Sequence, residues 1–417
     1  MAKRIEIEKK FYLKNIEKLI KIIEENNLNL INTNNEIDEY FTDINNNFIK
    51  NRTCLRIRKT NNEDMELTFK GKSLEFNNFY AKTENNINIK ISEYNNLLSL
   101  LKSIGYLSYT IVDKTRVTYS KKEENIEYNV MIDNIKGVGH FVEFEILSHD
   151  EFDDTEKLKD KLDNFVNLFK SIEFESADLP YRDFVAEGII SKIKSTNDLE
   201  CLLFDLDGTL INTEHAFYLS FKDVLSEQYG VNISLEQYVE EELNKDTNLI
   251  NSLKEKKLIK DNINEKDIME KVYEDYEKRF KNIITSLDSI LNFELLTKLK
   301  EKGLKLGLIT TSKNKFIDVL KSNLKINDIF DCIITRDDVK NLKPSSEAYE
   351  KALEILNVDP LNCVAFEDTN KGLAAANNAN INAIHINGYN LINKKIDNVF
   401  SVDYIQRVLL ILLNYID

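Results

Sequence analysis

The feature that most constrains the fold is a series of short, mostly apolar runs in the second half of the chain. Helical stretches separate the runs, which are 201–204, 305–309, 331–335, 363–366 and 382–386. Continuous apolar runs of this length are typical of strands buried on both faces. We therefore predict an α/β Rossmann-like fold, with a parallel sheet flanked by helices. Between about 213 and 293 the pattern is almost wholly helical, which predicts an all-helical cap inserted after the first strand.

The first half of the chain shows the other strand pattern, in which apolar and charged residues alternate. In Ile5–Phe11, the charged residues Glu6, Glu8 and Lys10 lie on one face of an extended segment, and most of the apolar residues lie on the other. This half is therefore rich in strands that have one buried and one polar face. Helical patterns intervene at about 13–26, 92–104 and 155–171.

Charged residues recur in alternating pairs on several of these candidate strands, and the pairs are segregated by sign. The acids are Glu6, Glu8, Glu143 and Glu145, with Asp133 in a further candidate strand. The bases are Arg56, Arg58, Lys70, Lys72, Lys114 and Arg116. A polar face toward water is the ordinary explanation of any one pair, but such a face would mix the signs. Segregation favours an antiparallel β-barrel with flanking helices, whose tunnel holds a divalent cation on its acids and a polyanion on its bases.

Composition limits the domain count, the partners and the location. The chain has 417 residues, so we predict two domains, 1–195 and 196–417. It carries 56 basic and 71 acidic residues, a net charge of −15, which disfavours binding to nucleic acid or to an anionic membrane. The four cysteines form no CxxC pair and the N-terminal segment lacks an apolar signal stretch, so we expect a cytoplasmic protein with free thiols.

The sharpest motif is Asp205-Leu206-Asp207-Gly208-Thr209, directly after the first predicted strand of the second half. Asp205 and Asp207 share one face of an extended segment, so both can point at one ligand above the sheet, where open α/β folds place their sites. One aspartate can attack phosphorus, and the other can protonate the leaving group and then activate water. Two aspartates at this spacing, with no other motif, more often belong to a solvated loop.

Three further polar elements follow this motif in order, which argues against a solvated loop. They are the hydroxyls of Thr310, Thr311 and Ser312, the cation of Lys343, and the acids Glu367 and Asp368. The hydroxyls suit a phosphoryl oxygen, and the acids are natural ligands of magnesium. A hard cation, a lysine and a hydroxyl are what a transferring phosphoryl group requires, so the sequence predicts a phosphatase site.

Together these motifs resemble those of the haloacid dehalogenase superfamily of phosphatases, over about residues 200–417. The resemblance implies that Asp205 is the nucleophile and Asp207 the acid/base, while Thr310 and Lys343 hold the phosphoryl group. It assigns a magnesium ion to Asp205, the backbone of Asp207 and Asp368, with Glu367 close by. The helical insertion is similar to the cap of the β-phosphoglucomutase and pyrophosphatase-like branch.

The first half resembles the triphosphate tunnel metalloenzymes, or CYTH superfamily, over about residues 1–190. The signature ExExK is present as Glu6-x-Glu8-x-Lys10. The motifs that follow in family order are 38–41, 55–58, 68–71, 114–116, 139–145 and 180–184. The superfamily includes class IV adenylyl cyclases and thiamine triphosphatases. The resemblance implies that Lys10 and the basic pairs bind a triphosphate. It implies that magnesium, or manganese, is held by Glu6, Glu8, Asp133, Glu143 and Glu145.

We therefore expect a bifunctional, metal-dependent phosphohydrolase that acts on small phosphorylated substrates. The tunnel domain would remove phosphate from a linear triphosphate, inorganic or organic. The second domain would dephosphorylate a small phosphate ester or pyrophosphate through an aspartyl-phosphate. Two alternatives for the tunnel stay open, a nucleotidyl cyclase and a polyphosphate- or nucleotide-binding module that regulates the phosphatase. The sequence identifies neither substrate and does not indicate the oligomeric state.

Overall fold

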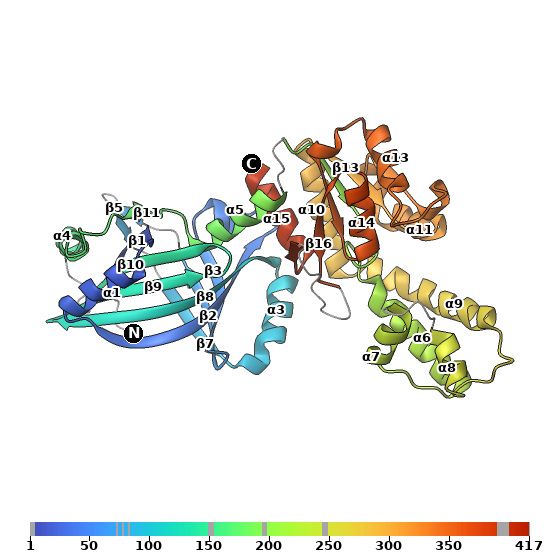
Figure 1. Cartoon of the computed structure of the whole chain (residues 1–417), viewed down its shortest axis with the longest axis horizontal. Helices are drawn as coiled ribbons and strands as arrows, with labels where there is room; N and C mark the ends of the chain where they lie inside the picture. The colour runs from blue at the N-terminus through green and yellow to red at the C-terminus, as the bar shows by residue number, and fades with distance from the viewer. Residues whose placement is uncertain are drawn as a thin grey trace. The chain divides into compact units, whose positions relative to one another are not determined.

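The structure is a computed structural model of the 417-residue chain. It describes residues 5–71, 74–76, 79–81, 84–148, 154–193, 198–243, 249–389 and 400–416. The chain separates into two compact units, Met1–Ile189 and Ile190–Asp417, both drawn in Figure 1. Within the described residues, no helix combines the length and the apolar character that crossing a lipid bilayer requires.

The described part of unit 1 is built on an antiparallel sheet of nine strands, in the order β11-β1-β10-β9-β8-β2-β3-β4-β7. The strands are β1 (Ile5–Tyr12), β2 (Asn29–Asp43), β3 (Cys54–Thr60), β4 (Asp64–Lys70), β7 (Glu84–Ile89), β8 (Tyr106–Glu123), β9 (Ile126–Ile135), β10 (Gly139–Ser148) and β11 (Glu175–Ser176). A separate hairpin consists of β5 (Leu74–Phe76) and β6 (Phe79–Ala81). The long central strands curve in Figure 1. The predicted class, an antiparallel tunnel-like sheet with flanking helices, is confirmed.

The sheet of unit 1 has an apolar face and a polar face because its side chains alternate. Helices α1 (Ile16–Glu25) and α4 (Thr155–Asn167) cover part of the apolar face, where Leu19 and Leu162 pack in one core with Phe144. Burial of each such side chain stabilises the fold by roughly 1.5–3 kcal/mol. The short α2 (Asn47–Lys50) and the longer α3 (Tyr94–Ser103) lie over β2, β3 and β8. The other face, which we call the tunnel face, carries the described charged residues Glu6, Glu8, Glu36, Asp38, Arg56, Arg58, Lys114, Arg116, Asp133, Glu143 and Glu145.

Helix α5 (Tyr181–Ile193) lies outside the three segments of the first half for which the sequence pattern predicted a helix. Its buried residues, among them Tyr181, Phe184 and Ile190, are distributed around the helix. A helix is recognised in a sequence by one apolar stripe, and this helix has none.

The described part of unit 2 contains a parallel sheet of six strands, in the order β14-β13-β12-β15-β16-β17. The strands are β12 (Cys201–Phe204), β13 (Lys305–Ile309), β14 (Cys332–Ile334), β15 (Cys363–Glu367), β16 (Asn382–Ile386) and β17 (Ser401–Val402). The predicted parallel Rossmann-like sheet is therefore confirmed. The chain leaves β12 for β13 on one side and returns to β15 on the other, so the strand order reverses at β12. Ligands in open α/β folds bind at this switch point, beyond the carboxyl ends of the strands.

Five α-helices and a short π-helical segment, Val239–Leu243, lie between β12 and β13 in the described part of the chain, and further helices flank the sheet. The first five are α6 (Thr213–Tyr229), α7 (Leu235–Tyr238), α8 (Leu249–Glu255), α9 (Glu265–Ile284) and α10 (Leu287–Glu301). The others are α11 (Asn314–Leu324), α12 (Ile326–Ile329), α13 (Glu347–Leu356), α14 (Asn370–Asn378) and α15 (Ile405–Ile416). Helices α6 to α9 form the cap around their own apolar core.

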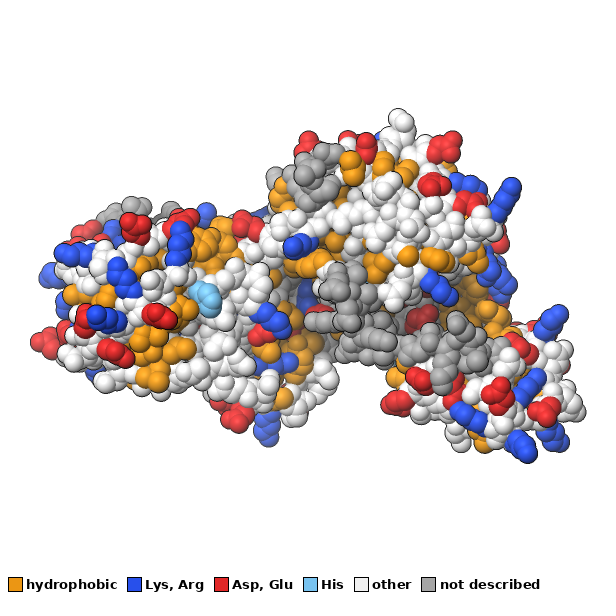
Figure 2. All heavy atoms as spheres, viewed as in Figure 1, with side chains coloured by type: hydrophobic (Ala, Val, Ile, Leu, Met, Phe, Trp, Pro, Cys, Tyr) orange, Lys and Arg blue, Asp and Glu red, His pale blue; other side chains and the backbone are white. Residues whose placement is uncertain are grey.

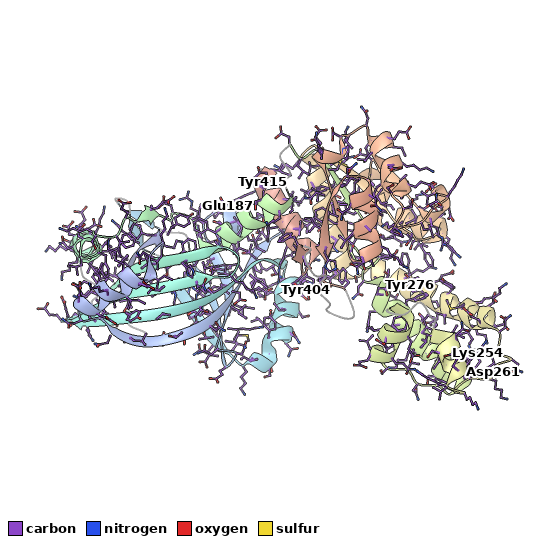
Figure 3. The ribbon with its side chains drawn as sticks, in the orientation of Figure 1. Glu187, Lys254, Asp261, Tyr276, Tyr404 and Tyr415 are labelled. Atoms are coloured by element: carbon purple, nitrogen blue, oxygen red, sulfur yellow. The ribbon has the colours of Figure 1, made fainter. Side chains whose placement is uncertain are left out.

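The cap contacts the sheet-bearing part of unit 2 through α9. The ring centroid of Tyr276 lies 5.4 Å from that of Phe316 on α11, in an edge-to-face arrangement. Figure 3 labels Tyr276 at this end of the cap and Lys254 and Asp261 at its far end. On the outer surface shown in Figure 2, basic and acidic side chains are interspersed.

Candidate active sites

Asp205 and Asp207 lie in a tight loop directly after β12. The amide of Asp205 donates to the carbonyl of Phe366 at 3.0 Å, which ties the loop to the end of β15. Gly208 adopts a φ of +80°, and a Cβ at this position would lie 2.1 Å from Oδ2 of Asp368. Only glycine therefore allows both the turn and the close approach of the acid.

Lys343 joins the acids of this site. Its Nζ lies 2.6 Å from Oδ1 of Asp205 and 2.6 Å from Oε1 of Glu367, and it also donates to the carbonyl of Ile309 at 2.8 Å. Tyr349 on α13 donates its hydroxyl to the same oxygen of Glu367. One buried cation and one phenol thus hold two acids that come from different strands.

Asp207 is held by hydroxyls that follow β13. Ser312 Oγ donates to Oδ2 of Asp207 at 2.6 Å, and Oγ1 of Thr310 lies 3.3 Å from the same oxygen. Thr310 Oγ1 in turn accepts from the amide of Ser312 at 3.0 Å. Thr311 is exposed, so the hydroxyl that contacts Asp207 next to Thr310 is that of Ser312. These contacts orient Asp207 as a proton donor and acceptor requires.

Three carboxylates of this site have the arrangement of a cation site. Asp205, Glu367 and Asp368 each offer an oxygen, and these oxygens lie within 4.8 Å of one another. Burial raises the pKa of Asp205 well above its usual range, against the opposing charge of Lys343. Burial and the charge of Asp205 raise the pKa of Asp368 likewise. Oε2 of Glu367 is buried and accepts no hydrogen bond within the described residues. A divalent cation with oxygen ligands fits this set, because it supplies the missing positive charge.

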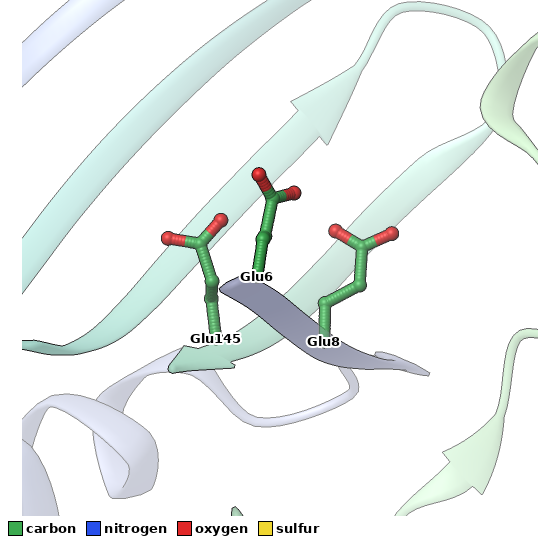
Figure 4. A group of neighbouring side chains, drawn as sticks. All are labelled: Glu6, Glu8 and Glu145. Carbon is green, nitrogen blue, oxygen red and sulfur yellow. The ribbon is translucent and has the colours of Figure 1, made fainter. Parts of the chain in front are cut away.

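A second acidic group lies on the tunnel face of unit 1 (Figure 4). Glu6 and Glu8 of β1 and Glu145 of β10 bring oxygens within 4.8 Å of one another, and Glu8 is the cross-strand partner of Glu145. Asn129 donates to Oε1 of Glu145 at 2.8 Å. Burial, followed by the charge of Glu6, raises the pKa of Glu145 to about 8. Repulsion of this kind among carboxylates fits a site for a divalent cation.

Asp133 and Glu143 lie apart from this trio because Arg116 holds both. Arg116 Nε donates to Asp133 Oδ1 at 2.7 Å, and its Nη2 contacts Asp133 and Glu143. Tyr181 of α5 also donates to Asp133, at 2.8 Å. Burial would raise the pKa of Asp133, but the charge and hydrogen bond of Arg116, the charge of Lys114 and the hydrogen bond from Tyr181 together lower it. In this arrangement the two acids neutralise and orient an arginine.

The other bases of the tunnel face meet two acids of β2. Arg58 donates to both oxygens of Asp38, at 2.6 and 2.7 Å, and Nη1 of Arg56 lies 3.6 Å from Asp38. Glu36 contacts Arg58 and Lys114, each at 3.1 Å. Burial would raise the pKa of Asp38, yet the charges of Arg56 and Arg58 lower it.

The remaining predicted bases lie on β1 and β4 or beyond the described part of the chain. Lys10 donates to the carbonyl of Leu179 at 2.5 Å, and its Nζ lies 4.3 Å from the ring centroid of Tyr181. Lys70 ends β4, opposite Glu84 of the edge strand β7. Lys72 lies outside the described residues.

Both units match known families. Residues 4–179 match the CYTH domain, and residues 202–386 match the haloacid dehalogenase-like hydrolases. The chain joins a CYTH domain to a haloacid dehalogenase-like hydrolase domain. These matches confirm both predicted resemblances and the prediction that the chain is an enzyme of the hydrolase class.

Curated and solved relatives cover one domain each. Pyrophosphatase PpaX of Bacillus cereus (strain B4264) is 28% identical over 186 residues, which is 43% of this chain and 80% of the relative. The structure of CbbY from Rhodobacter sphaeroides in complex with phosphate is 24% identical, covering 50% of this chain and 96% of its own, with a TM-score of 0.41. The PH1819 protein of Pyrococcus horikoshii OT3 is 20% identical, covering 44% of this chain and 98% of its own, with a TM-score of 0.36.

Sequence reasoning missed several groups in both domains. In the hydrolase domain it missed Tyr349, which contacts Glu367, and it expected Ser312 at a phosphoryl oxygen but did not predict its contact with Asp207. In the CYTH domain it missed Glu36, and it gave no role to Asp38, which lies in the motif 38–41. The alternation Glu36-x-Asp38 could have identified these acids, because it is the same i, i+2 pattern that marked the other charged pairs. Tyr349 gave no signal of this kind, since its role depends on the packing of α13 against β15.

Proposed function

We propose that this chain is a bifunctional, metal-dependent phosphohydrolase. The hydrolase domain dephosphorylates pyrophosphate or a small phosphate ester, and the CYTH domain hydrolyses a triphosphate. The observation that carries the proposal is the bridge from Lys343 to Asp205 and Glu367, beside an Asp207 oriented by Ser312. The similarity to proteins named pyrophosphatase supports a substrate that contains a phosphoanhydride bond.

In the hydrolase domain, Asp205 attacks phosphorus and its new O–P bond forms as the bond to the leaving oxygen breaks. Asp207 donates a proton to that leaving oxygen, then takes one from the water that attacks the aspartyl-phosphate. This second attack frees Asp205 and releases orthophosphate. Lys343 and the hydroxyl of Thr310 bind the phosphoryl oxygens and offset their charge. Lys343 contacts Asp205, and the hydroxyl of Thr310 lies 3.3 Å from Oδ2 of Asp207.

The acids of both domains would hold divalent cations. Asp205, Glu367 and Asp368 would bind one in the hydrolase domain, and Glu6, Glu8 and Glu145 would bind another in the CYTH domain. A bound magnesium ion supplies positive charge that keeps carboxylates ionised and draws electron density from phosphoryl oxygens. In the CYTH domain the basic groups Arg56, Arg58, Lys114 and Arg116 bind and orient the triphosphate along the tunnel face.

Replacement of Asp205 by asparagine tests the proposal most directly. An amide is a far poorer nucleophile, so pyrophosphate and phosphate-ester hydrolysis should fall by roughly a thousandfold or more. Tripolyphosphate turnover by the CYTH domain should persist. Phosphate release is measured with magnesium and manganese against tripolyphosphate, nucleoside triphosphates, thiamine triphosphate, pyrophosphate and sugar phosphates. Asp328→Asn, which changes an exposed aspartate of α12, is the matched control. Normal monophosphatase turnover in Asp205→Asn would refute the assignment.

A further inference from the structure

Glu36 of β2 is an acid on the tunnel face that the proposed reaction does not use. Its side chain is 7% exposed, and Oε2 lies 3.1 Å from Nη2 of Arg58 and 3.1 Å from Nζ of Lys114. Carboxylate and phosphate oxygens are bound by the same cationic donors. Glu36 therefore takes the place that Arg58 and Lys114 would otherwise offer to a phosphoryl oxygen.

Asp38, two residues along the same strand, is held in a different way. It accepts two directional hydrogen bonds from the guanidinium of Arg58, a bidentate arrangement that fixes the plane of that group. Oε2 of Glu36 accepts no hydrogen bond of good geometry within the described residues, although two cations are near it. The attraction at this oxygen is one of charge, without a directional hydrogen bond, and such a contact is weaker than a bidentate pair. Asp38 thus orients Arg58, while Glu36 is the partner that an incoming anion can displace.

Lys114 shows why an acid is present at this point. Its side chain is 2% exposed, and the acid nearest to its Nζ among the ion pairs of the described residues is Glu36. A buried ammonium without a counter-charge is strongly destabilising, so Glu36 stabilises the tunnel face when no phosphate is bound. A ligand that displaces Glu36 from Lys114 must therefore supply a negative charge in place of the Glu36 carboxylate.

We infer that Glu36 is a built-in competitor for phosphate, and that it makes the CYTH domain selective for long, highly charged phosphate chains. The inference rests on the proposed triphosphate site. Orthophosphate or pyrophosphate must displace Glu36 from Arg58 and Lys114 while making few other contacts. A triphosphate also reaches further bases, such as Arg56 and Arg116, and these contacts offset the displacement.

The test uses Glu36→Gln in the full chain, in an Asp205→Asn background that suppresses turnover in the hydrolase domain. The KM and kcat for tripolyphosphate and the inhibition constant of pyrophosphate are measured with magnesium. Removal of the competing charge should lower the inhibition constant of pyrophosphate about tenfold. The KM for tripolyphosphate should fall less than this. The preference of the site for tripolyphosphate over pyrophosphate should therefore decrease, while kcat should change little.

The matched control is Asp113→Asn, which also removes one negative charge from the CYTH domain. Asp113 adjoins Lys114 on β8, points to the other face, and pairs with the exposed Lys136 at 3.5 Å. Pyrophosphate inhibition should be unchanged in this control. An unchanged inhibition constant in folded Glu36→Gln overturns the inference, and so does an equal fall in the control. Thermal unfolding checks the fold. If Glu36→Gln does not fold, Glu36→Asp replaces it, because this variant keeps the negative charge on a side chain that is shorter by one methylene group.

Calorimetric binding of tripolyphosphate and of pyrophosphate to the same proteins separates this inference from the proposed function. If the Asp205→Asn protein binds tripolyphosphate without hydrolysing it, the triphosphatase proposal is wrong, and the binding comparison still tests Glu36. Tighter pyrophosphate binding by Glu36→Gln then supports the inference. If neither protein binds tripolyphosphate, both proposals are wrong.

Discussion

At the scale of single residues, Glu145 links metal binding to pH. Burial and the neighbouring charges of Glu6 and Glu8 raise its pKa from 4.5 to about 8. The carboxyl group of Glu145 has a higher pKa in the folded state than in the unfolded state. Its contribution to the free energy of unfolding is therefore complete below about pH 4.5 and is lost as the pH rises toward 8. We therefore expect Glu145 to be mostly protonated at pH 7 in the ion-free protein, and a cation bound by Glu6, Glu8 and Glu145 to displace that proton.

We expect Glu145→Gln to release fewer protons on magnesium binding at pH 7 than the unchanged chain does, by up to about one proton. Titration calorimetry in buffers of different ionisation enthalpy counts the released protons. The control is Glu63→Gln, which changes an exposed acid in the turn between β3 and β4. Equal proton release from Glu145→Gln and the unchanged chain would contradict the link between this carboxyl and the cation.

Many residues of the two candidate sites could be predicted from the sequence, because their charged or hydroxyl side chains recur at i, i+2 spacing or at the ends of strands. The sequence brought Glu6, Glu8 and Glu145 to one face, and the structure places their oxygens together. It could not separate Asp133 and Glu143 from that trio, because their pairing with Arg116 depends on strand register.

At the scale of elements, the start of α14 approaches the end of β15 closely. Gly372 lies in the first turn of α14, where a Cβ would be 1.9 Å from Oε2 of Glu367. Gly372→Ala should therefore lower the free energy of unfolding by about 1–3 kcal/mol, because either the helix or the carboxylate must move. It should also weaken phosphatase activity, since Glu367 contacts Lys343.

The matched control for Gly372→Ala is Gly188→Ala in α5, where a Cβ meets nothing within 4 Å. Alanine normally stabilises a helix interior relative to glycine, by about 0.5–1 kcal/mol. Thermal unfolding and phosphate release are measured for both variants. Stabilisation by Gly372→Ala with unchanged activity would show that α14 has no close contact with Glu367.

Elements were predictable where one physical pattern dominates. The buried parallel strand β12 is apolar throughout and β15 is apolar up to Glu367, while β1 alternates except at Lys9, so each has a clear strand pattern. Helix α5 has no apolar stripe, so its full length could not be predicted. The order of the strands in each sheet could not be predicted from the sequence either, because it depends on pairing between segments that are far apart in the chain.

At the scale of the whole molecule, we expect the two sites to act in succession on one phosphate chain. The CYTH domain would convert tripolyphosphate to pyrophosphate and orthophosphate, and the hydrolase domain would cleave the pyrophosphate. Covalent fusion raises the local concentration of the intermediate. The unchanged chain should give mainly orthophosphate, Glu6→Gln/Glu8→Gln should leave tripolyphosphate intact, and Asp205→Asn should accumulate pyrophosphate. Chromatography of the products over time distinguishes these three proteins. Identical products and rates from Asp205→Asn and from the unchanged chain would exclude a shared pathway.

The ion pairs of the tunnel face have a consequence for how the CYTH domain reaches its topology. Acidic β2 lies between the basic strands β3 and β8, and β8 is followed by the acid-bearing β9 and β10. A misassembled sheet that joined β3 directly to β8 would bring four cations together in a desolvated interior, which is strongly destabilising. The same ion pairs thus favour the placement of β2 between β3 and β8, because the acids of β2 meet bases on both neighbouring strands.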